Sequence, residues 1–262
     1  MRRGTRELLA DRPARNGGGL EFRPISCVVI VSIPATAHMS APIIVFDLDG
    51  TLVDTAPDLI AALKALFARE GLPSPGSELR NMIGGGARRL IERALAQKSI
   101  TISDRELERL FAGYIEHYAA HIADCSRPFP GLEPALDALA AAGYRLAVCT
   151  NKLEFLAVRL LEALGLAGRF TAICGQDTFG LQKPDPEVLR RTVARAGGRM
   201  PCALMVGDSG TDIDMAREAA IPVVAVDFGY TETPISLLAP DRIITRFDDL
   251  PAAVSELLRS PG

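Results

Sequence analysis

The stretch that decides the fold is Asp47-Leu48-Asp49-Gly50-Thr51, which directly follows the apolar run Ile43-Ile44-Val45-Phe46. A short, uninterrupted apolar run of this kind predicts a buried strand of a parallel sheet. Two carboxylates two residues apart, followed by a glycine, then stand at the carboxyl end of that strand. Open α/β sheets bind their ligands outside this end of their strands. The stretch therefore predicts a reactive site at one edge of a parallel sheet.

The chain from residue 144 onward extends this pattern, because short apolar runs alternate with amphipathic segments of helical spacing. Strands that alternate with helices predict a parallel sheet covered on both faces, a Rossmann-like α/β fold. The expected strands are 43–46, 144–149, 170–174, 202–206, 222–226 and 242–244.

Residues 57–128 break the alternation and show helical patterns only, notably at 86–97 and 104–122. The sequence thus predicts an all-helical cap at 57–128, inserted into an α/β core made of 39–56 and 129–262. Its position next to the Asp47 loop makes the cap a candidate lid.

The first cap helix has clear boundary signals. We expect Thr55 to cap its start, Pro57 to occupy its first turn and Gly71 to end it.

Residues 1–38 are rich in arginine and glycine and include an apolar run at 25–35, which loosely resembles a signal peptide. The charged part is long for a signal, and Pro24 and Pro34 bracket the apolar run. We expect Met39 to be the true start, and residues 1–38 to be a disordered or weakly packed extension without a catalytic role.

Composition excludes several classes of protein. The 262 residues are 48% hydrophobic, which is enough for a full α/β core. A net charge of -3 and a pI near 5.7, with basic residues scattered among acidic ones, argue against nucleic-acid binding. No apolar run reaches the roughly 18 to 20 residues of a membrane span. Five cysteines without C-x-x-C spacing fit a reducing compartment, so we expect a cytoplasmic protein.

Three further segments carry polar groups: Thr150-Asn151, Lys183-Pro184 and Gly207-Asp208-Ser209-Gly210-Thr211-Asp212. The first and third follow an expected strand directly, as Asp47 does. Each alone also fits a helix cap or a surface turn, but such caps and turns do not explain four segments in this order. Convergence at one sheet edge would bring two acid pairs, a hydroxyl and a lysine together.

Alternative interpretations of these residues are weaker. A calcium loop that begins at Asp47 would need glycine at its sixth position, where this chain has Leu52. Gly207-Asp208-Ser209-Gly210 matches the string around a trypsin-like serine, but that site needs an all-β domain. His117 and His121 have the spacing of a zinc pair, yet a third ligand is not evident and an exposed helix face is the simpler interpretation.

The chain resembles the haloacid dehalogenase superfamily of phosphohydrolases over about residues 42–260. The stretches at 47–59, 84–95, 129–131 and 150–152 look most like the phosphoglycolate phosphatases within it. The acid at position 49 and Thr51 favour phosphatases over the superfamily's dehalogenases, phosphonate hydrolases and sugar phosphomutases.

The resemblance implies Asp47 as the nucleophile that forms an aspartyl-phosphate, and Asp49 as the acid toward the leaving oxygen and then the base for water. It also implies Mg²⁺, held by Asp47, the backbone carbonyl of Asp49 and Asp208, with Asp212 in an outer or orienting position. Mg²⁺ suits an all-oxygen site that shields the dianionic phosphate.

Thr150, the backbone N–H of Asn151 and Lys183 would bind the phosphoryl oxygens. In the cap, Gly85, Gly86 and Arg88 belong to a glycine-rich helix start that could hold a small carboxylate, or could simply face solvent.

These inferences predict a Mg²⁺-dependent phosphatase of a small phosphorylated metabolite, foremost 2-phosphoglycolate, acting as a monomer or homodimer. The alternatives are a sugar phosphate, a pyrophosphate or pyridoxal phosphate as substrate, or a non-catalytic module that binds a phosphometabolite.

Overall fold

The computed structural model describes residues 41–76, 79–231 and 233–259. The expectations for residues 1–38 and for a start at Met39 lie outside these residues. Six parallel strands form the central sheet, in the order β5-β4-β1-β6-β7-β8. They are β1 (Ile43–Phe46), β4 (Arg145–Cys149), β5 (Ala172–Cys174), β6 (Ala203–Gly207), β7 (Val223–Val226) and β8 (Arg242–Ile244). The six predicted strands are confirmed, with bounds that differ by two residues at most.

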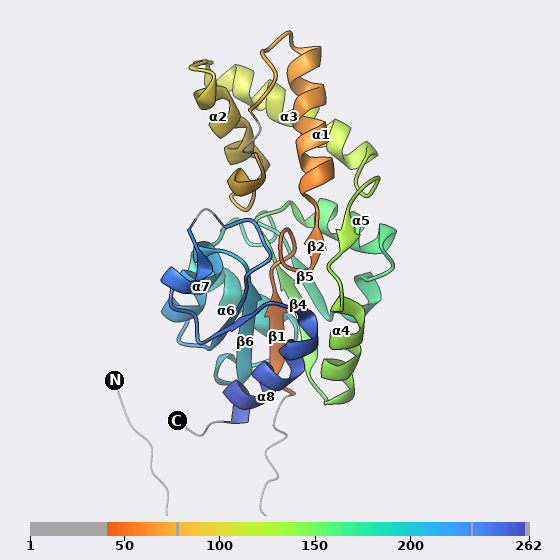
Figure 1. The fold of residues 1–262 in the computed structure, drawn as a ribbon, viewed down its shortest axis with the longest axis vertical. Coiled ribbons are helices and arrows are strands. Elements are labelled where there is room, and N and C mark those ends of the chain that lie inside the picture. Colours follow the sequence, from red (N-terminus) through yellow and green to blue (C-terminus); the bar gives the residue numbers. More distant parts are fainter. Residues whose placement is uncertain (1–40, 77–78, 232, 260–262) are drawn as a thin grey trace, which may run out of the picture. The chain divides into compact units, whose positions relative to one another are not determined.

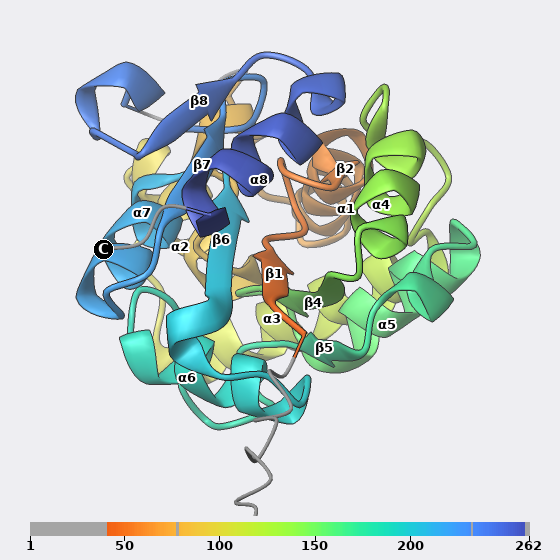
Figure 2. The ribbon, with the colours of Figure 1, turned by 90° about the horizontal axis from the view of Figure 1, so that it is seen from below.

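Helices cover both faces of this sheet, as Figure 2 shows in its view from below. Successive side chains of a strand point to opposite faces. Ile44 and Phe46 of β1 join the apolar cluster under one set of helices, whereas Ile43 and Val45 join the cluster under the other. The first set is α4 (Leu132–Ala141), α5 (Glu154–Ala163) and α8 (Leu250–Arg259), and the second is α6 (Pro186–Arg195) and α7 (Gly210–Glu218). Burial on both faces explains why the central strands β1, β6 and β7 are apolar.

The first strand of the sheet is separated from the next by a helical insertion, which we define as residues 56–126. It holds α1 (Ala56–Arg69), α2 (Ala87–Gln97) and α3 (Asp104–Ala120), drawn in orange to yellow in Figure 1. Helix α3 packs against both of the others. The predicted helical segments are confirmed, and α1 ends just before Gly71, whose φ of +65° suits a helix end. Short 3₁₀ turns occupy Arg80–Met82, Ala167–Arg169, Met200–Cys202, Ile235–Leu237 and Phe247–Asp249.

The chain enters and leaves the insertion through two short strands that pair antiparallel, β2 (Val53–Asp54) and β3 (Arg127–Pro128). The prediction of a purely helical segment at 57–128 was wrong at this end, because β3 lies inside it. Two residues are too few for a strand to show its alternating pattern in the sequence.

The prediction that Thr55 caps α1 with its side chain was also wrong. Its backbone is already helical (φ -96°, ψ -8°), and its hydroxyl donates a hydrogen bond to Asp49 Oδ1 at 2.8 Å. A capping residue has a non-helical backbone that lets its side-chain oxygen accept from an N–H of the first turn, and the helical backbone of Thr55 does not allow this.

Asp58, in the first turn of α1, ties the two ends of the insertion together. Its buried carboxylate accepts hydrogen bonds from the backbone N–H of Cys125 at 2.9 Å and of Ser126 at 2.7 Å, and from the Ser126 hydroxyl at 2.6 Å. The start of the insertion is thus fixed to the segment that leads out of it.

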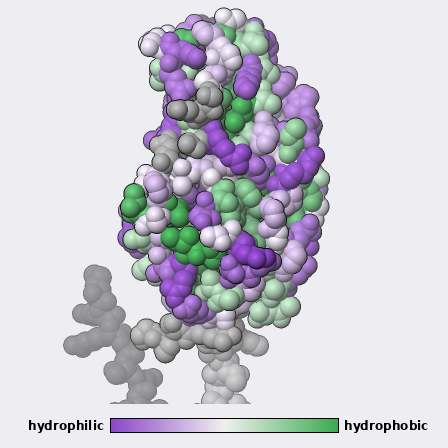
Figure 3. All heavy atoms as spheres, viewed as in Figure 1, coloured by the Kyte–Doolittle hydropathy of each residue, from purple (hydrophilic) through white to green (hydrophobic). Residues whose placement is uncertain are grey.

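The outer surface offers no broad apolar area on the face drawn in Figure 3, where hydrophilic and hydrophobic residues are interspersed. The large hydrophobic side chains that stay exposed among the described residues, Phe155, Leu237 and Ile243, come from three separate segments. Among the same residues, no helix combines the length and the apolar character that a membrane span requires.

Candidate active site

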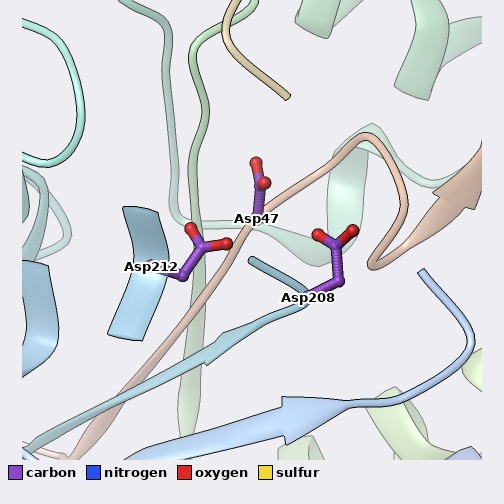
Figure 4. A group of neighbouring side chains, drawn as sticks. All are labelled: Asp47, Asp208 and Asp212. Carbon is purple, nitrogen blue, oxygen red and sulfur yellow. The ribbon is translucent and has the colours of Figure 1, made fainter. Parts of the chain in front are cut away.

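Three aspartates meet at the carboxyl edge of the sheet. Asp47 follows β1, Asp208 follows its neighbour β6, and Asp212 lies in the first turn of α7. One carboxylate oxygen of each lies within 4.8 Å of the others, and Figure 4 shows the three side chains around one space. All three are at most 4% exposed. The segments that begin at Asp47 and at Gly207 therefore converge, as predicted.

Lys183 supplies positive charge to this group. Its Nζ lies 2.8 Å from Asp47 Oδ1 and 2.7 Å from Asp212 Oδ1, and its side chain is buried. Asp212 also accepts hydrogen bonds from the Ser209 hydroxyl at 2.6 Å and the Ser209 N–H at 3.2 Å. With both oxygens engaged, Asp212 holds the lysine in place beside Asp47.

The electrostatics of this group leave negative charge uncompensated. Burial raises the pKa of Asp47 to about 8, with Lys183 opposing the rise and Asp212 and Asp208 adding to it. Burial likewise raises the pKa of Asp208 to about 6, and the Asp212 charge adds to this. Burial would lower the pKa of Lys183, but Asp212 and Asp47 raise it above its usual value. Three buried carboxylates thus share one ammonium.

These residues fit a divalent cation. A cation bound among Asp47, Asp208 and Asp212 would supply the positive charge that the group lacks. The potential ligands are carboxylate oxygens, which suit hard ions such as Mg²⁺.

Asp208 is held by Thr51 and Tyr230, contacts that the sequence did not predict. Its Oδ1 accepts from the Thr51 hydroxyl at 2.9 Å and its Oδ2 from the Tyr230 N–H at 2.7 Å. Gly50, with φ +87°, approaches so closely that a Cβ there would lie 2.4 Å from Asp208 Oδ2. The glycine in the first motif is therefore required by both backbone conformation and space.

Thr150 and Asn151 follow β4, the other neighbour of β1, and both are buried. Asn151 Oδ1 accepts from the Lys183 N–H at 2.9 Å, and its amide donates to the carbonyl oxygen of Gly84 at 3.3 Å. Asn151 thereby connects the Lys183 loop with the helical insertion. All four predicted segments meet at this edge.

Asp49 lies beside the aspartate group and has a partner that sequence reasoning missed. Lys152 Nζ is 2.9 Å from both oxygens of its carboxylate. Both side chains are largely buried, with 4% of Lys152 and 12% of Asp49 exposed. The signal for Lys152 was its position directly after Asn151, although nothing in the sequence gave its partner.

The predicted cap residues Gly85, Gly86 and Arg88 line a cleft of ≈ 410 Å³ together with Lys183 and Asn151. The Arg88 guanidinium is already engaged, because it pairs with Glu108 and lies 5.5 Å from the centre of the Phe111 ring. Gly85, Gly86 and Arg88 therefore lie at the site, but Glu108 already compensates part of the charge of Arg88.

His117 on α3 and His121 just after it do not join a metal group of this kind. Their rings are tilted against each other with centres 4.6 Å apart, and His121 Nδ1 lies 2.8 Å from Asp124 Oδ2. The group of potential metal ligands found among the described residues is the three aspartates.

Comparison with known proteins agrees with this geometry. Residues 44–226 match the family model of the haloacid dehalogenase-like hydrolases. A phosphoglycolate phosphatase of Mesorhizobium japonicum is 49% identical over 86% of this chain and all of its own length. One of Agrobacterium fabrum is 46% identical over 87% of this chain and 98% of its own. A solved structure described as a predicted phosphoglycolate phosphatase from Haemophilus somnus 129pt superposes with a TM-score of 0.76 at 30% identity, covering 82% of this chain and 99% of that one.

The chain therefore belongs to the haloacid dehalogenase-like hydrolases. Within them it is a phosphoglycolate phosphatase-like enzyme, a phosphoric monoester hydrolase.

Proposed function

We propose that this enzyme is a Mg²⁺-dependent phosphatase that converts 2-phosphoglycolate to glycolate and phosphate. The observation that carries the proposal is the meeting of Asp47, Asp208 and Lys183 in a buried space with Asp49 beside them. The substrate follows from the relatives, which are named phosphoglycolate phosphatase and match this chain over nearly their whole length.

In this mechanism Asp47 attacks phosphorus and the bond to the leaving oxygen breaks, which gives an aspartyl-phosphate. Asp49 donates a proton to the leaving oxygen, so glycolate departs as an alcohol. Asp49 then takes a proton from water as the water attacks the phosphoryl group, which frees phosphate and restores Asp47.

Asp47, Asp208 and the backbone carbonyl of Asp49 would hold Mg²⁺. When bound, the ion supplies positive charge that shields the phosphate dianion from the attacking carboxylate. Asp212 positions Lys183, which binds the phosphoryl oxygens together with Thr150 and the backbone N–H of Asn151.

The assignment of the helical insertion as a cap is part of the proposal, with Gly85, Gly86 and Arg88 as substrate contacts from it. The insertion reaches the site through Gly84, whose carbonyl accepts from Asn151. Free thiols at Cys125, Cys149, Cys174 and Cys202 support the proposed cytoplasmic location.

Phosphate release tests the proposal directly. Wild type with Mg²⁺ is expected to prefer 2-phosphoglycolate over sugar phosphates, pyrophosphate and pyridoxal phosphate, and Asp47→Asn is expected to release none of them above background. A flat profile would keep the phosphatase and reject the substrate. Equal release by wild type and Asp47→Asn would support the non-catalytic alternative.

A further inference from the structure

A second, smaller cavity lies where the insertion meets Asp49. The described residues that line it are mainly apolar, such as Leu59, Leu90 and Leu156. The charged residues among them are Asp49 and Lys152. Its volume of ≈ 30 Å³ is roughly what one or two water molecules need. Only a small group fits there beside Asp49 in this conformation.

One polar atom in this lining has no partner. The hydroxyl of Tyr118, on α3, is buried and makes no hydrogen bond with the described residues, and the whole side chain is 1% exposed. A buried hydroxyl without a partner is unfavourable, so such groups usually serve a ligand or an ordered water. The neighbouring Tyr114 differs, because its hydroxyl donates to the carbonyl oxygen of Leu59 at 3.2 Å.

The ring of Tyr118 also holds Lys152. The lysine Nζ lies 4.7 Å from the ring centre while it pairs with Asp49. An ammonium over an aromatic face is attracted by the ring and loses part of its hydration. Lys152 and the Tyr118 hydroxyl thus form a pair of donors at one small, otherwise apolar cavity.

The bond lengths of 2-phosphoglycolate keep its carboxylate close to Asp49 and so within reach of this cavity. Its carboxylate oxygens are three bonds from the leaving oxygen and so lie roughly 3 to 4 Å from it. Asp49, as the group that protonates the leaving oxygen, must lie within hydrogen-bond distance of it. Lys152, 2.9 Å from Asp49, is therefore within reach of the same carboxylate.

We propose that Lys152 and the Tyr118 hydroxyl form the recognition site for a carboxylate on the carbon next to the phosphate ester oxygen. This rests on the proposed function and deepens it. When the substrate enters, Lys152 exchanges its ion pair with Asp49 for one with the substrate carboxylate, and Tyr118 donates to the second carboxylate oxygen. Esters without that carboxylate leave Lys152 bound to Asp49 and are poor substrates.

The test compares esters that differ only in this group. One pair is 2-phosphoglycolate with 2-hydroxyethyl phosphate, and the other is phospholactate with 1,2-propanediol 2-phosphate. The variants are Lys152→Met, Tyr118→Phe and the matched control Tyr114→Phe. The quantity measured is the ratio of kcat/KM for the carboxylate ester to kcat/KM for its neutral partner.

We expect Lys152→Met to lower this ratio roughly 10- to 100-fold and Tyr118→Phe to lower it about 5-fold, because a charged and a neutral hydrogen bond to the carboxylate are lost respectively. Tyr114→Phe should leave the ratio unchanged. Tyr118→Phe removes a single oxygen atom that has no partner among the described residues, so its folding is not at risk.

The outcomes separate this proposal from the function. A wild type that prefers phospholactate but not 2-phosphoglycolate rejects the proposed substrate and supports the carboxylate site. A wild type that prefers 2-phosphoglycolate, with all variants slowed equally on both members of each pair, keeps the substrate and overturns the site. A wild type without preference in either pair overturns both.

Discussion

The edge of the sheet and the inner face of the helical insertion treat their polar groups differently. At the edge, the buried carboxylates of Asp47, Asp208 and Asp212 all accept hydrogen bonds or ion pairs from nearby groups. On the insertion, the face toward Asp49 is apolar, and the hydroxyl of Tyr118 has no partner within the described chain. The carboxylates at the edge are therefore already paired without substrate, whereas the insertion presents a hydrogen-bond donor that has no partner among the described residues.

This contrast divides the work of the enzyme. Groups at the edge that act on the phosphoryl group should matter equally for every ester, because all esters share that group. Lys152 and the groups on the insertion should matter only for esters whose leaving group contacts them. Substitutions in both regions test this division.

Asp47→Asn should lower phosphate release by about 10⁴-fold or more on every ester, because the nucleophile is lost. A panel assay with Mg²⁺ measures this. Asp214→Asn, an exposed position on α7, is the matched control and should retain full activity. If Asp47→Asn kept substantial activity on some esters only, the edge would not be the shared part of the site.

Lys183→Met should lower kcat/KM by about 10³-fold on all esters, since it removes fixed charge from the transferring phosphoryl group. It should also cost about 3 kcal/mol of stability, because Asp47 and Asp212 lose their buried partner. Thermal unfolding and the panel assay measure the two effects, with exposed Lys64→Met as the control. A loss confined to carboxylate esters would show instead that Lys183 distinguishes between leaving groups.

Without a divalent ion, the protein should lose stability as pH rises from 5 to 8. The pKa of Asp47 is raised from 3.8 to about 8 and that of Asp208 from 3.8 to about 6, so the folded state binds more protons than the unfolded state across this window. The resulting stabilisation is full below the unfolded pKa values and is lost as pH rises through the folded ones, by on the order of 2 to 4 kcal/mol.

Chemical unfolding in EDTA at several pH values measures this slope. Mg²⁺ should flatten it, because the ion stabilises the charged carboxylates, and Asp47→Asn should make it shallower. If the stability in EDTA did not change with pH, the buried carboxylate charges at the edge would not destabilise the fold.

Asp58→Asn should have the smallest effect, a destabilisation of about 1 to 2 kcal/mol, because an amide accepts more weakly from the Cys125 and Ser126 N–H groups. Limited proteolysis should show earlier cleavage within the insertion, and selectivity between esters should fall more than activity. Exposed Glu116→Gln on α3 is the control. Unchanged proteolysis would show that the hydrogen bonds of Asp58 do not hold the insertion in place.

The sequence predicted the sheet and the residues at its edge well, for a physical reason. Strands buried on both faces are continuous apolar runs, and polar residues directly behind them must gather at one edge. Asp47, Thr150 and Asp208 were placed by this logic alone.

The sequence could not predict the contacts between side chains that lie far apart along the chain. Lys152 pairs with Asp49, 103 positions away, and Tyr230 donates to Asp208 from 22 positions away. Such pairs leave no periodic signal. Thr55 has the residue type of a helix cap, but its backbone is helical and its hydroxyl donates to Asp49.

The pairing of β2 with β3 has a consequence for how this enzyme could change over time. Asp54 lies opposite Arg127 in that ladder, so the 72 intervening residues begin and end at neighbouring points of the chain. Segments whose ends are close can be exchanged with little disturbance elsewhere. The insertion is in effect a replaceable module: a different one grafted between Asp54 and Arg127 would redirect the same catalytic strands to another leaving group.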